Sequence, residues 1–591
     1  MKISKKTLFI TLAGALLFGF RFLMGLSKFT SGDSLQIYLI GLKSYTSGIF
    51  PYFGPDVVYT HSQIPGALQG LLISVPLQLL SIPEAPHLLL NIMTFTLLVF
   101  FGWYTTKRIP NVPKWFIYLW LLTSPWTLHY STHIENPSYV IVGSILFFVS
   151  FFELGGLYKN KILSDKFTFF FLGFSIFWIM QLHLSWVIMI PYVLWVIFIN
   201  RKDWKLLLKG AIFFLIGSAV SISTLIPTLL RGFGSGGVES NIIFNYDNIF
   251  QIPTMISRYF MFSSFEIARF IGHSSKTRLE FLGDQPWVIP FVIFLLLIGF
   301  LQVGYFIFSF FRKNNLPEWS KIAKLCILSI VLLSVSFLFS ITKPRSHTFF
   351  IIYPIAMMYA FYCYGNLFKW KPRIISRIAM VALGAGVLFH ISLFIGRFPE
   401  RSLFSVRQQI AKAINEKDYT FLALRRESTL MKTNKETLWQ KQESDSAGTS
   451  SFYNNFEPNT PYFRAQNVVS NEKFEGNYAC KVDSLQSVSL KFSKALQELE
   501  NPKKIKTSFS VKSNNLEDFD IVFQTNSKSQ ITHITKKLIS LAPNSEGWNV
   551  IQVEFNIPQD SNAVSNVHMH FTMNNETGSV LYIDNWELNF K

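Results

Sequence analysis

The chain has 591 residues, half of them hydrophobic, with 61 phenylalanines and a mean hydropathy of +0.31. This composition indicates a polytopic membrane protein and excludes a single soluble domain. The formal net charge is +19, but the basic residues of the apolar part lie in short loops, and no basic run is interleaved with aromatic residues. We therefore exclude nucleic acid as a partner.

The first apolar segment, residues 7–26, is long enough to span a bilayer. The basic residues within 1–6 predict a cytoplasmic N-terminus, so Asp33, just past the segment, faces outward. No small-residue cleavage site follows the segment, and we expect a retained helix. A carboxylate beside lipid costs free energy unless water or a cation compensates its charge, and one that is retained often has a function. Asp33 is therefore either a solvated loop residue or a functional one.

The remaining apolar segments alternate with basic loops, and this alternation predicts about eleven spans. We interpret residues 66–82, which contain Pro76, as an outer interfacial helix, because counting them as a span would place every later basic loop outside. The predicted spans are 7–26, 85–105, 115–128, 138–153, 167–182, 184–199, 207–227, 287–310, 322–341, 348–366 and 375–396.

Three outer loops carry polar residues, and the long loop 228–286 adds arginines and a predicted amphipathic helix, Met255–Ile271. The residues concerned are Asp33, His61 and Gln63 in the first loop, His129, His133 and Glu135 in the second, Lys343, Arg345 and His347 in the third, and Arg231, Arg258 and Arg269 in the long loop.

Acids and bases gathered on one face suit the transfer of a sugar from a lipid phosphate to a hydroxyl group. A carboxylate takes the acceptor's proton, and fixed cations hold the phosphate as it leaves. The three cysteines lack metal-ligand spacing, and no HxxH or HExxH motif occurs. We predict no metal site among these residues, although acids on two loops are also compatible with a divalent cation.

Two segments of the sequence resemble those of a known family. The segment SGDSLQIYLIGLKSYTSGIF is similar to the start of the polyprenyl-phosphate-sugar-dependent glycosyltransferases of the GT-C fold, such as protein mannosyltransferases and aminoarabinose transferases. That family places a catalytic Asp after the first span, and Asp33 takes this position. The family's second acid corresponds to Glu135, or to the adjacent Asn136. The segment SITKPRSHTFFIIYP resembles its late basic motif, which lies near the donor phosphate.

The chain departs from the family at two places. Ser34 replaces a frequent Glu, and His61 or Gln63 stands where a phosphate-binding Lys is common. The resemblance then implies that the phosphate is bound by Lys343, Arg345, His347 or the long loop, including Arg231. Two alternatives remain: Glu135 is also compatible with a residue that caps or abuts the start of a span entered at Asn136 and Pro137, and Lys343 and Arg345 are also compatible with interfacial side chains that reach for water.

The resemblance implies a hexosyltransferase-type enzyme in the inner or plasma membrane that uses a polyprenyl-phosphate-linked sugar donor. Its acceptor is a protein, a lipid or a glycan, and no cofactor is required. The alternative function is a lipid-linked sugar or polysaccharide transporter or flippase. Transporters usually show internal repeats and polar residues at mid-membrane, and neither feature is evident here.

The composition changes after residue 400, and the sequence predicts three parts: a transmembrane domain (1–400), an amphipathic linker (401–450) with a helix at Ser402–Asn415, and an extracytoplasmic β-sandwich (451–591). The segments NFEPNTPYF and YIDNWELNF resemble carbohydrate-binding jelly rolls, in which Glu457 and Asp584 would share a structural calcium ion. The predicted strands are Val488–Phe492, Ile505–Val511, Phe519–Gln524, Asn549–Phe555, Val567–Thr572 and Val580–Phe590.

Overall fold

The structure is a computed structural model, and its described residues fall into two compact units. One unit comprises Met1–Gly41 and Pro51–Arg407, and the other comprises Leu42–Phe50 and Gln408–Lys591. The described residues are 4–29, 32–48, 50–57, 62–230, 244–272, 274–312, 318–340, 346–417, 440–442, 450–456, 468–469, 472–476, 479–483, 488–489, 492–495, 499, 502–527, 531–538, 544–557, 564–574 and 579–591.

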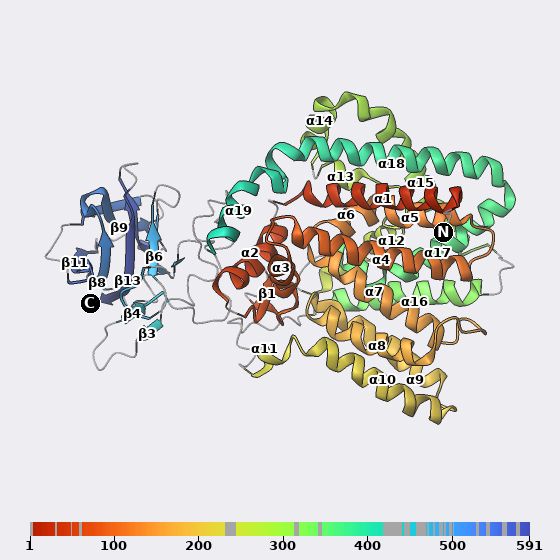
Figure 1. Cartoon of the computed structure of the whole chain (residues 1–591), viewed down its shortest axis with the longest axis horizontal. Helices are drawn as coiled ribbons and strands as arrows, with labels where there is room; N and C mark the ends of the chain where they lie inside the picture. Colours follow the sequence, from red (N-terminus) through yellow and green to blue (C-terminus); the bar gives the residue numbers. More distant parts are fainter. Residues whose placement is uncertain are drawn as a thin grey trace. The chain divides into compact units, whose positions relative to one another are not determined.

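The first unit is helical, and its elements follow the predicted order (Figure 1). The helices are α1 (Lys5–Leu26), α2 (Gly32–Ser47, which continues into the second unit), α3 (Leu68–Leu79), α4 (Ala85–Arg108), α5 (Lys114–Thr123), α6 (Pro125–Thr132), α7 (Asn136–Leu154), α8 (Asp165–Met180), η1 (Leu184–Met189), α9 (Ile190–Ile199), α10 (Trp204–Ile222), α11 (Ile226–Leu230), η2 (Tyr246–Gln251), α12 (Ile252–Met261), α13 (Ala268–Ile271), α14 (Ser275–Asp284), η3 (Pro286–Val288), α15 (Ile289–Ser309), α16 (Trp319–Leu338), η4 (Ser346–Ile352), α17 (Tyr353–Trp370) and α18 (Pro372–Arg401).

The polytopic helical architecture is confirmed, but the count of eleven spans is not. Each predicted span overlaps at least one helix, yet only eight helices within the described ranges are long and apolar enough to cross a membrane. Those eight are Thr7–Leu26, Ala85–Arg108, Asn136–Leu154, Trp204–Ile222, Pro286–Ser309, Trp319–Leu338, Thr348–Trp370 and Pro372–Glu416. The other three predicted spans correspond to α5 with α6, to α8 and to η1 with α9, which are shorter or interrupted.

Three local features differ from the sequence-based expectations. Ser124 is extended, so a single predicted span is divided into α5 and α6, the latter with Pro125 in its first turn. The helix expected at Met255–Ile271 is two helices, α12 and α13. An unexpected antiparallel hairpin, β1 (Phe53–Val57) and β2 (Ser62–Pro65), follows α2.

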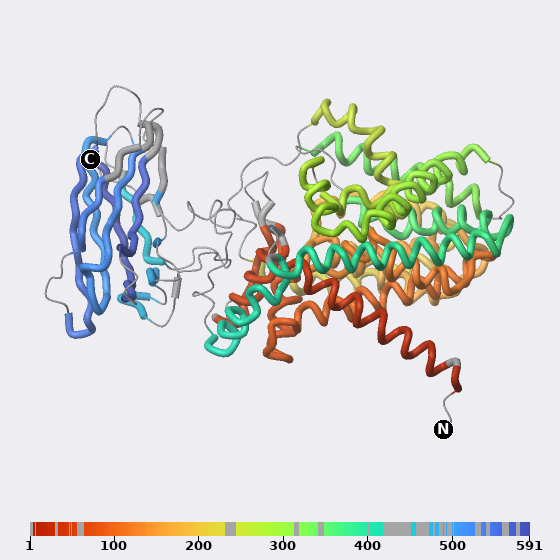
Figure 2. Tube along the Cα trace, turned by 90° about the horizontal axis from the view of Figure 1, so that it is seen from above, coloured from red at the N-terminus to blue at the C-terminus, as the bar shows by residue number. Residues whose placement is uncertain are grey.

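The helices α7 and α17 form the centre of the first unit. The apolar windows of both are buried along their whole length, whereas that of α1 is mostly exposed. The Ser144 hydroxyl on α7 donates a hydrogen bond of 2.6 Å to the carbonyl of Ile351 in η4. Figure 2 shows the N-terminal turns of α1 at the edge of the unit. Phe9 and Leu16 of this helix are 72% and 75% exposed. In a membrane protein such apolar side chains face lipid.

The second unit contains the predicted β-sandwich. A four-stranded sheet has the order β10-β9-β12-β7, and a seven-stranded sheet has the path β11-β8-β13-β4-β3 with β6 and β5 beside it. Rings from the two sheets meet in one core, where Phe571 lies 4.7 Å from both Phe509 and Trp586. The strands are β3 (Gln440–Gln442), β4 (Ser450–Asn454), β5 (Val468–Val469), β6 (Ala479–Val482), β7 (Phe492–Ala495), β8 (Lys504–Ser513), β9 (Phe519–Ser527), β10 (Ile531–Lys537), β11 (Asn549–Asn556), β12 (Val564–Met573) and β13 (Leu581–Phe590).

Five of the six predicted strand segments overlap β8, β9, β11, β12 and β13. The sixth, Val488–Phe492, instead contains one isolated bridge at Val488 and reaches the start of β7. The helix predicted at Ser402–Asn415 corresponds to η5 (Leu403–Ser405) followed by α19 (Arg407–Glu416), which buries Ile410, Ala413 and Ile414 on one face.

Candidate functional site

The predicted site residues differ in how far the structure describes them. Asp33 lies in the first turn of α2 and His347 lies in η4, and only the backbone is described at these two positions. Glu135 is described in full. His61, Arg231, Lys343 and Arg345 lie outside the described residues.

Glu135 is joined to the segment between the first two helices. Its carboxylate forms an ion pair with the ammonium group of Lys28, and their side chains are 12% and 19% exposed. The hydroxyl of Ser34 donates to the same carboxylate oxygen over 3.4 Å. Ser34 directly follows Asp33, so the structure brings the start of α2 and the start of α7 together although they are about one hundred residues apart.

The alternative that Glu135 caps or abuts the start of a helix is confirmed for its position but not for a side-chain cap. Glu135 occupies the N-cap position of α7, which begins with Asn136 and Pro137, but its side chain makes no capping hydrogen bond. Its carboxylate instead accepts from Lys28 and Ser34. The residue is therefore held by charge and by a hydroxyl group rather than by the helix that it precedes.

Two buried histidines lie beside this ion pair. The rings of His129 and His133 are 5.0 Å apart, and Nδ1 of His133 is 2.6 Å from the carbonyl oxygen of His129. Nε2 of His133 is buried without a hydrogen-bond partner. Burial, Lys28 and Arg397 lower the pKa of His133 well below 6.5, so this imidazole is neutral at pH 7.

Arginines surround the same region. Arg397, near the end of α18, interacts electrostatically with Glu135 and Tyr130. Tyr130 in turn interacts with Arg258 on α12 and Arg269 on α13. Burial and Arg269 lower the pKa of Arg258, because neighbouring cations destabilise one another. A phosphate anion bound here would relieve this repulsion.

A buried arginine fixes the helix that carries the histidines. Arg21 on α1 is fully buried and donates to the carbonyl of Leu122 and the hydroxyl of Ser131, each over 2.8 Å, and to the hydroxyl of Thr94 over 3.3 Å. These bonds join α1 to α4, α5 and α6. Because it is used in this way, we assign Arg21 a structural role.

The opposite end of α7 carries a second acid with a different environment. Glu153 is fully buried and pairs with Arg108. It also accepts from the hydroxyl of Tyr104 over 2.7 Å and from the backbone N–H of Ile162 over 2.7 Å. The two acids lie near opposite ends of α7, which separates them by about 27 Å at 1.5 Å per residue. Glu153 has every partner it needs, which identifies a structural anchor.

Asp584, a predicted calcium ligand of the β-sandwich, accepts hydrogen bonds from the backbone. Asp584 is fully buried and accepts from the N–H groups of Phe474, Glu475 and Asn585 over 2.8 to 3.1 Å. Glu457 lies outside the described residues. Across the part of the chain that the structure describes, no group of three His, Cys, Asp or Glu side chains is arranged to hold a metal ion.

Sequence reasoning missed Lys28 and gave Arg397 no role. Lys28 stands five residues before Asp33 and past the end of a span, where a basic residue on the predicted outer side runs against the positive-inside pattern. That exception is the signal that marks it. Arg397 ends the last predicted span on the same side and carries the same signal.

Comparisons with known proteins give only distant similarities. No protein-family model matches the chain, and no curated protein matches it. Among solved structures, the arabinosyltransferase EmbB from Mycobacterium smegmatis is 11% identical with a TM-score of 0.31, and the match covers 99% of this chain and 65% of the EmbB chain. ArnT from Cupriavidus metallidurans, solved with undecaprenyl phosphate, is 13% identical with a TM-score of 0.39, and the match covers 70% of this chain and 78% of the ArnT chain.

The chain thus spans less than two thirds of the length of EmbB. The C-terminal region is similar to the xylan-binding CBM22-1 domain from Paenibacillus barcinonensis, at 9% identity and a TM-score of 0.16, covering 26% of this chain and 85% of that domain.

Proposed function

We propose that the chain is a membrane glycosyltransferase that moves a sugar from a polyprenyl-phosphate carrier to a hydroxyl acceptor on the extracytoplasmic face. The observation that carries this proposal is the junction of Lys28, Ser34 and Glu135. It joins the segments that carry the two predicted acids at one end of the helical unit, with histidines and arginines around them.

In the proposed reaction Asp33 is the general base. The acceptor oxygen attacks the anomeric carbon, and its proton passes to the Asp33 carboxylate. The bond between the anomeric carbon and the phosphate oxygen breaks, and polyprenyl phosphate leaves with the electron pair. Phosphate is a good leaving group, so the reaction needs no general acid.

Glu135 acts in this proposal as the second acid, which orients the acceptor. The ammonium group of Lys28 and the hydroxyl of Ser34 hold this carboxylate in a fixed position. A carboxylate of fixed position is suited to accepting a hydrogen bond from a sugar or serine hydroxyl.

The phosphate of the donor is assigned to the cationic residues. Arg258, Arg269 and Arg397 supply the described part of this positive region. We propose that Lys343, Arg345, His347 and Arg231 complete it, as the family resemblance implies, and that His61 also contacts the substrate. Fixed cations stabilise the charge that develops on the departing phosphate. No cofactor is part of this scheme, and addition of a chelator tests whether a divalent ion takes part.

The remaining assignments follow the positive-inside pattern. We propose a multi-pass plasma or inner membrane location with a cytoplasmic N-terminus and an extracytoplasmic β-sandwich. The β-sandwich is proposed to act as a carbohydrate-binding module, and the acceptor is a protein, a lipid or a glycan.

The test compares surface glycans and glycoproteins by mass spectrometry in a deletion strain complemented with variant genes. We expect Asp33→Asn to abolish the modification, with a loss of at least about 100-fold in rate, while the protein stays folded in the membrane. The matched control is Asp165→Asn, which makes the same change in the first turn of α8, where Asp165 pairs with Lys161, four residues earlier.

Near-normal transfer by Asp33→Asn would contradict the mechanism. A strain that loses carrier-linked sugar from the outer leaflet, without loss of transfer in purified vesicles, would instead identify a flippase.

A further inference from the structure

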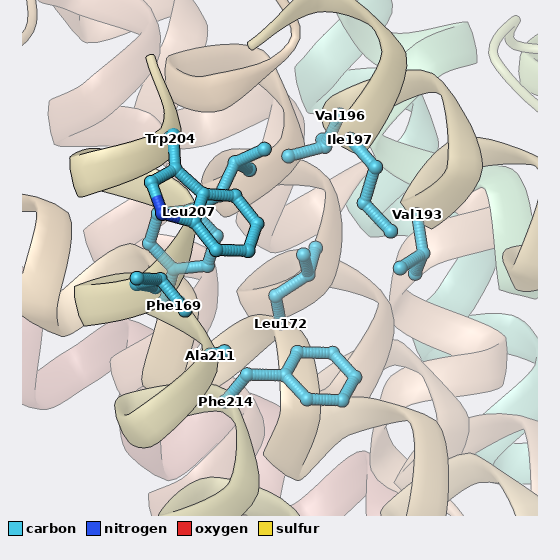
Figure 3. A pocket seen from close by; sticks show the side chains of 10 residues that line it. Phe169, Leu172, Val193, Val196, Ile197, Trp204, Leu207, Ala211 and Phe214 are labelled. Atoms are coloured by element: carbon cyan, nitrogen blue, oxygen red, sulfur yellow. The ribbon is translucent and has the colours of Figure 1, made fainter. Parts of the chain in front are cut away.

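An apolar groove lies between α8, α9 and α10 (Figure 3). Its volume is about 300 Å³, at the lower end of the range for small-molecule sites. Ten side chains line it: Phe169, Leu172, Val193, Val196, Ile197, Trp204, Leu207, Leu208, Ala211 and Phe214. The Trp204 indole N–H is the one polar group among these side chains, so the groove suits a hydrocarbon chain.

Glycines explain how the walls of the groove are held. A methyl group at Gly173 would lie 2.1 Å from the carbonyl oxygen of Phe214, and one at Gly217 would lie 2.0 Å from that of Phe170. Only glycine allows α8 and α10 to approach so closely. The groove lies where the ten-residue helix α9 faces this closely packed pair.

The groove opens to the outside of the helical unit. Trp204 is 65% exposed, and Ile197 and Leu208 are each 49% exposed. Since α10 is one of the candidate spans, the outside at this level is lipid. An open apolar groove in a membrane is filled by a lipid chain, because water has no partners there.

The turn at the end of the groove is strongly basic. Arg201, Lys202 and Lys205 flank Trp204 and are all exposed. The single acid of this turn, Asp203, is used as the cap of α10 and accepts from the N–H of Leu206 over 3.0 Å. Arg201 stacks on Phe198 at 4.0 Å from the ring centre, which holds its guanidinium close to α9.

The groove belongs to the end of the unit that carries Glu153. The Trp195 indole on α9 donates to the carbonyl of Gly155 over 3.1 Å, and the Asn200 amide donates to that of Leu154 over 2.8 Å. Both carbonyls lie at the end of α7 remote from Glu135. The groove and its basic turn are therefore separate from the proposed donor site.

We propose that this groove binds one acyl chain of an anionic glycerophospholipid, with the phosphate of the headgroup held by Arg201, Lys202 and Lys205. The charge of the turn selects the occupant, because a basic cluster beside a span attracts anionic headgroups. Trp204 occupies the depth of the headgroup, where indole rings are favoured. This inference is independent of the proposed function.

The experiment uses the purified full chain in detergent micelles, with bound lipid counted by native mass spectrometry after addition of phosphatidylglycerol or phosphatidylcholine. We expect phosphatidylglycerol to be retained preferentially. Ala211→Trp fills the groove, and Lys202→Glu with Lys205→Glu reverses two exposed charges. Each change is expected to weaken phosphatidylglycerol binding by about tenfold.

Two controls separate the groove from general effects. Ile212→Trp places the same ring on α10 at a position that is 58% exposed and does not line the groove. Lys369→Glu with Lys371→Glu reverses two charges at the end of α17. Both controls are expected to bind phosphatidylglycerol as the parent does.

Equal retention of the two lipids would overturn the assignment of an anionic headgroup. Unchanged binding by both Ala211→Trp and the double Lys variant would overturn the site. Displacement of phosphatidylglycerol by stoichiometric undecaprenyl phosphate would assign the groove to the carrier lipid and would also overturn the proposal.

Discussion

The ion pair between Lys28 and Glu135 makes a prediction that a double-mutant cycle can test. The three variants are Lys28→Met, Glu135→Gln and the combination of both. If the pair holds the start of α7 against the segment before α2, the two single changes must be coupled. If it is an incidental contact, their effects on the free energy of unfolding will add.

The expected coupling follows from the burial of the pair. Two unit charges about 4 Å apart interact by about 4 kcal/mol at an effective dielectric constant of 20, whereas fully exposed pairs contribute about 0–1 kcal/mol. Side-chain exposures of 19% and 12% lie between these cases, and we expect a coupling of about 1.5 kcal/mol.

The single changes should differ in cost. Lys28→Met leaves a carboxylate that is mostly buried without its cation, and we expect a loss of about 2 kcal/mol. Glu135→Gln keeps an acceptor for the Ser34 hydroxyl and leaves a lysine that can reach water, so we expect a loss of about 1 kcal/mol. The double variant should lose about 1.5 kcal/mol, less than the sum of the two.

The assay is denaturant unfolding of the purified chain in detergent, followed by intrinsic fluorescence. Arg407 and Glu84 form a matched control pair, since the Arg407 side chain is 45% exposed, and their coupling should be at most about 1 kcal/mol. A Lys28–Glu135 coupling below about 0.5 kcal/mol would refute the reasoning.

Three further predictions concern stability. Arg108→Met should cost about 3–5 kcal/mol in denaturant unfolding, because it leaves the buried Glu153 unpaired, and the exposed Lys159→Met is its control. Gly217→Ala should cost about 1–3 kcal/mol, because its methyl group meets a carbonyl oxygen; Gly384→Ala, where a methyl group meets no atom within 4 Å, should be nearly neutral by thermal unfolding. Below pH 6.5 the His133 imidazole binds a proton in the unfolded state but stays neutral in the folded chain, where its pKa is well below 6.5. The free energy of unfolding therefore falls by up to about 1.4 kcal/mol for each unit by which the pH falls. His133→Asn should give a shallower slope in thermal unfolding between about pH 6.5 and 5, and an unchanged slope would contradict the assignment.

Most of the helical framework follows from hydropathy, because long apolar segments have few alternatives in a membrane. The exceptions have local causes. Pro125 interrupts an apolar run that hydropathy alone treats as continuous. The first strand of the hairpin, β1 (Phe53–Val57), contains Gly54 and Pro55, which argue against a strand when the sequence is considered alone.

The candidate site was less predictable because its contacts are long-range. The sequence indicated Glu135 as a polar residue at a span entry, but its partner Lys28 is 107 residues away. Loop topology singled out Asp33 and the late basic segment, and the resemblance gave them roles, whereas the places of Arg397 and the buried histidines depend on how α6, α7 and α18 pack. Periodicity and composition carry no record of such packing.

The hydrogen bond from Ser144 to Ile351 bears on how the chain is made. The acceptor is synthesised 207 residues after the donor, which takes about 10–40 s at 5–20 residues per second. During that interval α7 has to stand in the membrane without η4 and α17, which later enclose it. A serine hydroxyl can meanwhile donate to the carbonyl one turn earlier in its own helix, here that of Val140. The Ser144 hydroxyl therefore has a hydrogen-bond acceptor in the membrane even before η4 and α17 are synthesised and pack against α7.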